Sequence, residues 1–462
     1  MAYTTINNGK IYFNTKLYTG NGSAGNSITS VGFQPDWTWI KDRDNTRNHI
    51  LTDAVRGATK VVFSNDAAAE STDSSTLTAF GSDGFTLGNG TKVNGNNIKF
   101  ASWNWLGAGT APSNTYAVKV VSDGGNKYRF DDFGTSTVTL ELSEGGTFTF
   151  DQSDSSNNGH PLRFSTTSNG THGGGSEYTT GVTTNGTPGN AGAYTRITVA
   201  ASAPTLYYYC TQHSGMGGQA NTPTTNSFSN FSGSIQTNIS PNTTSGFSIV
   251  KYTGTGANAT VGHGLGSAPR AMFFKNLEEG AEGWFVYHES IGNTKRLLLN
   301  DSSATSTSST FYQDTSPTSS VFSVGSNHGP NGPDAMICYA FAEKKGYSKF
   351  GGYTGNGNAD GTFIYTGFKP AWFMIKRSAV AGENWYMYDN KRPNAFNPNK
   401  YILIANETAS EYTNFGDIDF LSNGFKVRTT NNSANDSGET YIYMAFAENP
   451  FTSSTGTPVT AR

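Results

Sequence analysis

The chain has 462 residues, about three times the length of a typical single domain, and only 14% of them are charged, against about 25% in ordinary globular proteins. The net charge is −3, and no cluster of Lys and Arg is long enough to form a nucleic-acid footprint. Aromatic residues make up 13% and glycines number 55, which excludes a disordered chain and indicates an all-β protein with many turns.

Targeting and cross-linking signals are absent from the sequence. The N-terminus has no basic region followed by an apolar run, so we expect no secretory signal. No apolar stretch approaches the roughly 20 residues that span a bilayer, so we expect no membrane insertion. The two cysteines, Cys210 and Cys338, fall in different predicted domains, which argues against a disulfide framework.

The first hundred residues carry a pattern that returns later in the chain. It comprises Tyr18-Thr-Gly-Asn-Gly22, Gly32-Phe-Gln-Pro-Asp-Trp-Thr-Trp-Ile-Lys41, Ser82-Asp-Gly-Phe-Thr-Leu-Gly88 and the closing Phe100-Ala-Ser-Trp-Asn-Trp105. Apolar and polar residues alternate in these segments, which predicts half-buried strands, and the Asp-Gly and Asn-Gly pairs predict hairpin turns. No sustained helical period is present, and the best helix candidate, residues 52–60, is interrupted by Gly57.

The Pro-x-Trp-x-x-x-Lys element is predicted to be a central strand. Trp37 would fill a sandwich core, and Pro35 would lie at the start of the strand, where no ladder donor is needed. Lys41 could bind a ligand, but a lysine at this place more often marks a strand end. We therefore expect it to reach solvent along its aliphatic stem.

The central part of the chain carries a possible metal-ligand set. Cys210-Thr-Gln-His213-Ser-Gly-Met216 follows an aromatic strand, and His160 opens an alternating segment fifty positions upstream. A thiolate, two imidazoles and a thioether are the ligands of a blue-copper site. A lone buried Cys or Met is commonly a core residue, but four matching positions favour a metal site.

Residues of roughly 115–222 resemble a cupredoxin through these positions. The resemblance implies a small Greek-key β-sandwich with a type 1 copper site held by His160, Cys210, His213 and Met216. Many cupredoxins follow the first His with an Asn that braces the ligand loop, whereas Pro161 stands here. The brace must therefore come from elsewhere in the chain or be missing.

The opening pattern recurs twice after this segment. The second copy contains Tyr252-Thr-Gly-Thr-Gly256 and closes on Tyr339-Ala-Phe-Ala-Glu343, and the third contains Tyr353-Thr-Gly-Asn-Gly357 and closes on Met444-Ala-Phe-Ala-Glu448. The repeated lysines Lys275 and Lys376 are 101 residues apart, whereas 234 residues separate Lys41 from Lys275. The longer interval predicts that the cupredoxin-like module is inserted between the first two repeats.

The predicted organisation is therefore all-β, with four domains. These are repeat 1 (1–110), the cupredoxin-like domain (111–222), repeat 2 (223–345) and repeat 3 (346–462). Each repeat is expected to be a β-sandwich that buries its own core. Core positions on the same phase of the repeat strands are Trp37, Trp372, Phe425 and Phe446.

The repeats also resemble a β-sandwich domain of unknown function that recurs in virion proteins of tailed phages, especially marine ones. The resemblance rests on residues 33–41, Val55-Arg-Gly57, the Gly-Phe segments and the Ala-Phe-Ala closes. It implies jelly-roll-like sandwiches in a non-enzymatic structural protein exposed on the virion surface, as a tail fibre that binds a receptor or as a capsid decoration. The implied partners are other virion proteins, further copies of the chain and a host surface receptor, with assembly in the host cytoplasm.

Two other functions stay open at this point. One is a copper-binding redox protein in which the repeats only carry the cupredoxin-like module, and the other is a glycan-binding adhesin whose aromatics stack on sugars. No nucleophile elbow, Walker loop or zinc-protease motif is present. The acidic cluster around Glu278, Glu279 and Glu282 is interpreted as a solvated loop, and His172, beside three glycines, is not expected to be a ligand.

Overall fold

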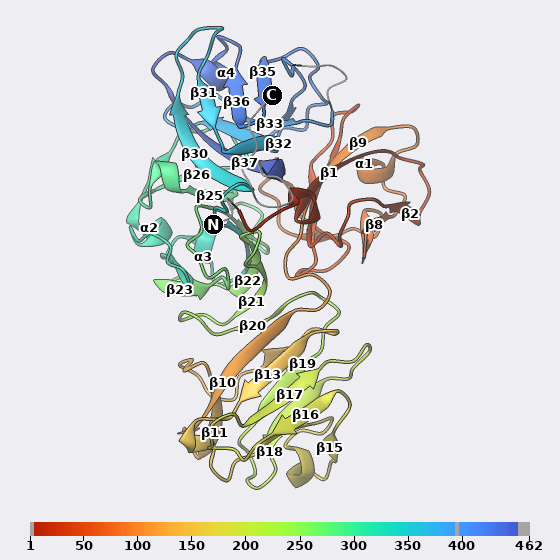
Figure 1. Cartoon of the computed structure of the whole chain (residues 1–462), viewed down its shortest axis with the longest axis vertical. Coiled ribbons are helices and arrows are strands. Elements are labelled where there is room, and N and C mark those ends of the chain that lie inside the picture. The colour runs from red at the N-terminus through yellow and green to blue at the C-terminus, as the bar shows by residue number, and fades with distance from the viewer. Residues whose placement is uncertain (1–3, 393–396, 451–462) are drawn as a thin grey trace. The chain divides into compact units, whose positions relative to one another are not determined.

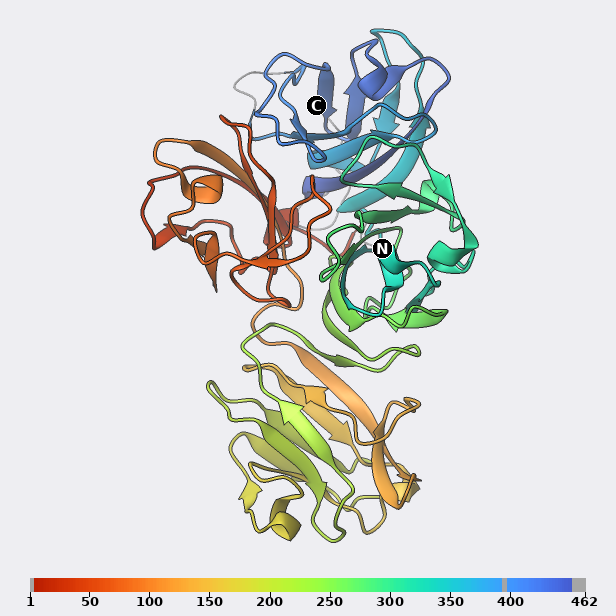
Figure 2. The same ribbon diagram turned by 180° about the vertical axis from the view of Figure 1, so that it is seen from behind.

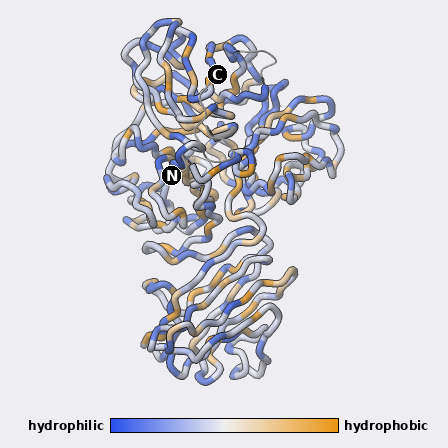
Figure 3. Tube along the Cα trace, viewed as in Figure 1, coloured by the Kyte–Doolittle hydropathy of each residue, from blue (hydrophilic) through white to orange (hydrophobic). Residues whose placement is uncertain are grey.

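The computed structural model describes residues 4–392 and 397–450 and is all-β, as the sequence predicts (Figures 1 and 2). Contacts divide the chain into two compact units. Unit 1 comprises Met1–Gly107, Pro241–Ala259 and Leu265–Arg462, and unit 2 comprises Ala108–Ser240 and Thr260–Gly264. Figure 3 shows short hydrophobic stretches interspersed with hydrophilic ones. Among the described residues, no helix has the length and apolar character needed to cross a membrane.

Unit 1 contains the same antiparallel arrangement of four strands three times. The orders are β1-β9-β3-β4 in repeat 1, β22-β29-β24-β25 in repeat 2 and β30-β37-β32-β33 in repeat 3. The bounds are β1 (Phe13–Thr19), β3 (Trp37–Asp42), β4 (Ile50–Asp53), β9 (Lys99–Trp105), β22 (Phe247–Thr253), β24 (Ala271–Asn276), β25 (Phe285–His288), β29 (Ala335–Phe341), β30 (Ser348–Thr354), β32 (Phe368–Arg377), β33 (Trp385–Asp389) and β37 (Thr440–Pro450). The shared order confirms the repeat architecture.

Shorter elements form a second layer in each repeat, with sheet orders β2-β8-β7 in repeat 1 and β31-β36-β35 in repeat 3. The remaining strands are β2 (Asn26–Ile28), β5 (Lys60–Val61), β6 (Ser71–Thr72), β7 (Leu77–Gly81), β8 (Gly84–Leu87), β23 (Ala259–Gly262), β26 (Lys295–Leu298), β27 (Ser306–Thr307), β28 (Val321–Val324), β31 (Phe363–Tyr365), β34 (Leu403–Ile404), β35 (Ile418–Leu421) and β36 (Gly424–Val427). The helical turns are η1 (Gly9–Ile11), α1 (Thr91–Asn94), η4 (Glu289–Ile291), α2 (Ser309–Tyr312), α3 (His328–Asn331) and α4 (Asn432–Asn435). The helix candidate at residues 52–60 is instead the end of β4 and a turn.

A buried asparagine explains why the Tyr-Thr-Gly motif repeats. Asn94 ends α1, and its Nδ2 donates to the carbonyls of Gly88 at 2.7 Å and Ser23 at 2.8 Å. Its Oδ1 accepts from the backbone N–H of Asn21 at 2.9 Å. The asparagines that end the two equivalent helices, Asn331 and Asn435, make the same bonds in their own repeats.

The tyrosine and glycine of the motif complete this contact. The Tyr18 hydroxyl donates to the Val93 carbonyl at 2.8 Å, and the Tyr353 hydroxyl donates equivalently within repeat 3. A Cβ on Gly20 would lie 2.2 Å from the Gly95 carbonyl oxygen, so no other residue fits at this approach. In each repeat, the motif therefore bonds the end of the first strand to the helical turn that precedes the last strand.

The repeated lysines are buried, and the expectation that they reach solvent is wrong. Lys41, Lys275 and Lys376 are each 0% exposed. Each Nζ donates to the carbonyl of the next residue, at 2.7 Å in repeat 1 and 2.8 Å in the other two. Burial lowers the pKa of each lysine to about 8. The central strands are covered on both faces, so these amines meet backbone carbonyls where water was expected.

The three repeats share one aromatic core. Trp37 of repeat 1 stacks on Tyr339 of repeat 2 with ring centroids 4.2 Å apart, and Trp105 meets Trp372 of repeat 3 edge-on at 5.8 Å. The predicted core residues are confirmed as buried, with Trp37, Trp372 and Phe425 at 0% exposure and Phe446 at 1%. Each repeat was expected to bury its own core, and repeat 1 does have a cluster of its own, but the largest cluster contains residues of all three repeats.

The alternation along β3 shows how one strand serves two cores. Trp37 and Trp39 belong to the shared cluster, whereas Ile40 packs in a separate cluster of repeat 1 with Phe85 and Phe100. Successive side chains of a strand point to opposite faces. The central sheet of repeat 1 therefore lies between the shared core and a core of its own.

At each of the three interfaces between repeats, a side-chain N–H of one repeat bonds to a backbone carbonyl of the next. Trp284 Nε1 of repeat 2 donates to the Phe63 carbonyl of repeat 1 at 2.7 Å, and Trp385 Nε1 of repeat 3 donates to the Leu298 carbonyl of repeat 2 at 2.8 Å. His49 takes the equivalent place between repeats 1 and 3, with Nε2 2.9 Å from the Ile404 carbonyl oxygen. Trp385 is the first residue of β33, and His49 and Trp284 lie one residue before β4 and β25, the equivalent strands.

A second buried histidine joins repeats 2 and 3. His288 Nδ1 accepts from the backbone N–H of Ser290 at 3.2 Å, so its proton lies on Nε2, which is 3.1 Å from the Tyr443 carbonyl oxygen. Burial lowers the pKa of His288 from 6.5 to about 4. The imidazole is therefore neutral at neutral pH.

Unit 2 is a separate sandwich of two five-stranded sheets, with orders β11-β10-β13-β17-β16 and β12-β19-β18-β14-β15. Most neighbours are antiparallel, but β10 with β13 and β12 with β19 are parallel. Phe130 packs against Tyr208, and Phe150 against Phe164, between the sheets. The elements are β10 (Ser113–Ser122), β11 (Asn126–Phe130), β12 (Leu140–Glu141), β13 (Thr147–Asp151), η2 (Ser155–Asn157), β14 (Leu162–Ser165), η3 (Gly170–Gly173), β15 (Glu177–Tyr178), β16 (Val182–Asn185), β17 (Tyr194–Thr198), β18 (Leu206–Cys210) and β19 (Gly218–Asn221). The next two strands, β20 (Phe228–Asn230) and β21 (Thr237–Asn242), belong to the sheet that contains β22.

The asparagine contact predicts a large loss of stability in Asn94→Ala. The change leaves the buried Gly88 carbonyl without its donor, at a cost of about 1–3 kcal/mol, and removes the part-buried bonds to Ser23 and Asn21, so we expect the free energy of unfolding to fall by about 2 kcal/mol. Asn96→Ala, at an exposed site two residues on, is the matched control. Urea unfolding measures both variants, and equal stability of the two would contradict the structural role of Asn94.

The neutral His288 predicts destabilisation in acid. The unfolded chain binds the proton near pH 6.5 and the folded chain only near pH 4, so the unfolded state holds more protons between these values. The free energy of unfolding should therefore fall as the pH drops from 7 to 4, by on the order of 3 kcal/mol for this residue. Urea titrations should show a shallower fall in His288→Gln, whose amide keeps one donor and one acceptor; an unchanged slope would refute the assignment.

Candidate metal centre

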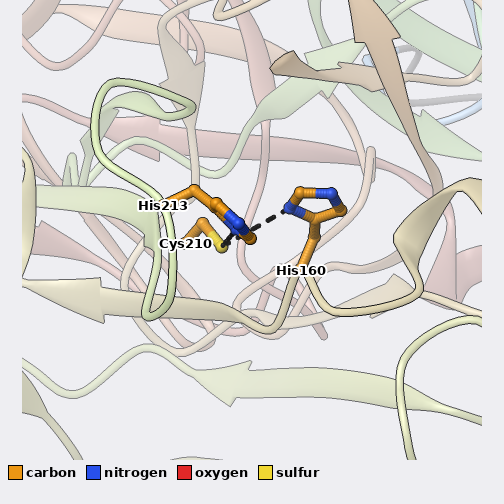
Figure 4. Close-up of side chains that lie close together, drawn as sticks. All are labelled: His160, Cys210 and His213. Carbon is orange, nitrogen blue, oxygen red and sulfur yellow. Dashed lines mark hydrogen bonds between the residues drawn. The ribbon is translucent and has the colours of Figure 1, made fainter.

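Three of the four predicted ligands converge at one end of unit 2. His160 lies two residues before β14, and Cys210 is the last residue of β18. These strands are antiparallel neighbours in which Leu162 pairs with Cys210. His160 lies two residues before Leu162, so its side chain is on the same side of the sheet as that of Cys210 and close to it. His213 approaches from the loop that follows β18, as Figure 4 shows.

The distances between donor atoms suit a metal ion with trigonal ligands. Cys210 Sγ lies 3.9 Å from His160 Nδ1 and 3.7 Å from His213 Nδ1. A metal bound at about 2.0–2.1 Å to nitrogen and about 2.3 Å to sulfur, with angles near 120°, places these atoms about 3.8 Å apart. The donor atoms of all three residues lie within 4.8 Å of one another, so the group could hold one ion.

Burial is graded across the centre. Cys210 is buried, His160 is half-buried and His213 is exposed. Burial and the neighbouring His213 lower the pKa of His160, which favours the neutral imidazole that a metal requires. Met216, the predicted axial ligand, is buried in the loop between β18 and β19, and its part in the centre stays a prediction.

Gln152 and Tyr128 supply the brace that Pro161 cannot. The carbonyl of His160 accepts from the Tyr128 hydroxyl at 2.8 Å and from Gln152 Nε2 at 2.9 Å. Gln152 Oε1 accepts in turn from the backbone N–H of Leu162 at 3.2 Å. Both sides of Pro161 are therefore tied to one buried glutamine, which fixes the backbone that carries His160.

Tyr128 touches the centre at two further points. Its backbone N–H donates to the carbonyl of Met216 at 3.0 Å. Burial and the neighbouring Cys210 raise the pKa of Tyr128 far above its ordinary value, so its hydroxyl stays protonated beside the sulfur. Tyr128 of β11 thus bonds to the backbone of His160 and of Met216 and lies beside Cys210.

The loop of His213 is held from a second segment. Asn169, with φ of 61°, donates through Nδ2 to Ser214 Oγ at 2.9 Å and accepts at Oδ1 from the backbone N–H of Gly215 at 2.8 Å. Lys127 Nζ also donates to the Gly215 carbonyl. His172 Nε2 lies 3.1 Å from the carbonyl oxygen of Cys210.

A second group of possible ligands occurs in unit 1, where Glu279, Glu282 and His328 lie close together. His328 Nδ1 and Glu279 Oε2 are 3.5 Å apart, and both side chains are exposed by more than 40%. The backbone of this acidic loop has a structural task, because Lys275 Nζ donates to the carbonyls of Glu282 at 2.9 Å and Glu279 at 3.4 Å. We therefore assign the loop no metal.

The fold and the centre define an all-β repeat protein with an inserted sandwich domain. A family described as a domain of unknown function, DUF7483, matches residues 8–124 and 215–450, and the chain belongs to this family. No curated protein and no solved structure matches the chain. His160, Cys210 and His213 lie in the unmatched interval 125–214, whereas Met216 and residues 108–124 and 215–240 of unit 2 lie within the match.

The glutamine brace predicts that Gln152→Ala weakens metal binding. Without its two bonds, the segment that carries His160 gains freedom, and the loss of such outer partners costs about 10–100-fold in metal affinity. Competition with a chromophoric chelator measures this dissociation constant. Gln236→Ala, in the same unit but bonded to Thr139, should keep the affinity of the unmodified protein. Equal affinity in both variants would show that the brace is dispensable.

Proposed function

We propose that this chain is a non-enzymatic structural protein exposed on the surface of a phage virion, and that its inserted domain binds copper. The structural role is supported by the use of the repeated residues. The asparagines and lysines that recur in the repeats are buried and bonded to backbone carbonyls, and Trp284 and Trp385 donate to backbone carbonyls of a neighbouring repeat. A rigid unit with its polar repeats engaged in this way suits an assembly component.

The virion assignment rests on the resemblance of the repeat motifs to virion domains of tailed phages. Tail fibre and capsid decoration both agree with this proposal, with other virion proteins and a host receptor as partners. Mass spectrometry and immunogold labelling of purified particles test it directly. Absence of the chain from the particles would refute the assignment and leave the copper proposal standing.

The copper proposal is carried by the two sulfur–nitrogen distances of 3.7 and 3.9 Å. Soft thiolate and imidazole ligands in a trigonal arrangement favour copper. His160, Cys210 and His213 would hold the ion, with Met216 as axial ligand, and copper bound there would exchange single electrons. The exposed His213 gives a partner or an ion access to the centre.

A glycan-binding role has less support. All seven tryptophans are buried, six of them at 0% exposure, and they therefore offer no platform for sugar stacking. The pairs that they form, such as Trp37 with Tyr339, belong to the shared core. We accordingly give the structural and copper-binding roles precedence.

The donor geometry predicts an intense visible absorption band when Cu²⁺ is added to the purified protein. Cys210→Ser removes the thiolate and should abolish the band, whereas Cys338→Ala, at the other buried free cysteine, should retain it. Because binding needs a deprotonated thiol and neutral imidazoles, affinity should fall with acidity. Absence of a band in the unmodified protein, with Cys210 shown to be reduced, would refute copper binding but not the fold.

A further inference from the structure

The first strand after the Tyr-Thr-Gly motif lies at the edge of the small second sheet of each repeat, and the side that faces away from that sheet differs between the three repeats. This strand is β2 in repeat 1, β23 in repeat 2 and β31 in repeat 3. Register aligns β2 with β31, because Ile28 pairs with Phe85 and Ile364 pairs with Phe425, each in the Gly-Phe segment of its repeat. The flanking residues on the outer face are then Ser27 and Thr29 in repeat 1, and Phe363 and Tyr365 in repeat 3.

The edge in repeat 2 already has an extended segment bonded to it. Ser234 and Ile235 donate their backbone N–H groups to the Thr260 carbonyl at 3.0 and 3.1 Å. The Thr260 N–H donates to Ser234 Oγ at 2.9 Å. Outward-facing backbone groups of this strand can therefore take up an added segment.

The edge in repeat 3 is unpaired and aromatic. Among the described residues, β31 pairs only with β36. Phe363 is 42% exposed and Tyr365 is 59% exposed, and both belong to the small set of large apolar side chains with such exposure. The equivalent Ser27 and Thr29 are exposed as well but polar.

The hydrogen bonds beside β31 fix the direction of its free backbone groups. The Thr362 carbonyl accepts from Val427 at 3.0 Å, and the Thr366 N–H donates to Asn423 at 3.0 Å. Even-numbered residues therefore face β36, and with a period of two the N–H and C=O groups of Phe363 and Tyr365 point outward. An unpaired edge with such groups is a template for strand addition.

We propose that β31 pairs antiparallel with the β31 strand of a second copy of this chain. The segment Phe363-Ile364-Tyr365 is nearly symmetric about Ile364, so a two-fold axis at Ile364 places Phe363 opposite Tyr365 of the partner subunit. Four backbone hydrogen bonds and two cross-strand aromatic pairs then form together, and such pairs stabilise antiparallel strands. A self-complementary strand fits a second copy better than a foreign segment, since a two-fold interface uses the same patch twice.

The strand is three residues long, so the contact is a weak dimer whose population depends on concentration. Sedimentation velocity of the full chain over a hundredfold concentration range measures it. The double variant Phe363→Ser with Tyr365→Thr carries the residues of repeat 1 at these positions and should raise the dissociation constant at least tenfold. Tyr412→Ser, which removes another exposed aromatic of repeat 3, should leave it unchanged.

Cross-linking tests the register. A mixture of a Phe363→Cys chain and a Tyr365→Cys chain should form a disulfide-linked dimer on mild oxidation, and either chain alone should do so at least tenfold less. An unmodified protein that stays monomeric throughout would overturn the proposal, as would a dimer that the double variant leaves intact. Equal cross-linking of Phe363→Cys with itself would overturn the register, and binding of a foreign extended peptide without self-association would overturn the choice of partner.

Discussion

The burial of both faces of the central sheets is the constraint on which unit 1 depends. Residues of β3, β24 and β32 are buried along almost the whole length of each strand. One face contributes Trp37 and Trp372 to the core that all three repeats share. Burying such a side chain contributes about 1.5–3 kcal/mol or more relative to leaving it in water. A single repeat would expose this face, so the repeats are stable together and form one unit.

The same constraint accounts for the repeated polar residues. A strand end covered on both faces loses water from its backbone carbonyls, and buried carbonyls without donors are costly. The amines of Lys41, Lys275 and Lys376 serve the carbonyls at these ends. Indole and imidazole donors serve the seams. Each repeat therefore has a lysine at this position because a buried backbone carbonyl needs a donor there, and no ligand is required to explain the three lysines.

The sequence was sufficient where the signal is local. Period-two alternation and the Gly-rich turns predicted the strands, and the recurrence of Pro-x-Trp-x-x-x-Lys predicted the repeat. The burial of Lys41 could not be predicted in the same way, because the layer that covers it comes from residues distant in the chain, such as Thr408, whose carbonyl lies 3.2 Å from Nζ. The shared core was missed for the same reason, since alternation shows that a face is apolar but not what it packs against.

The candidate metal centre shows the same division between local and distant information. The spacing of Cys210 and His213 and the alternating segment after His160 were enough to name ligands that converge. Gln152 and Tyr128 carried no signal, because their contribution depends on how β11 and the segment after β13 meet the ligand segments in space.

These braces also decide what a metal would do here. Gln152, Tyr128 and Asn169 fix the ligand segments through bonds between protein groups alone. In small metal-dependent domains the ion supplies the folding energy, because no preformed site exists without it. Unit 2 has an aromatic core of its own, as in the contact of Phe130 with Tyr208, so we expect it to fold without an ion. The side chains of His160, Cys210 and His213 are therefore positioned by the protein alone, and copper, if it binds there as proposed, would do so without refolding the domain.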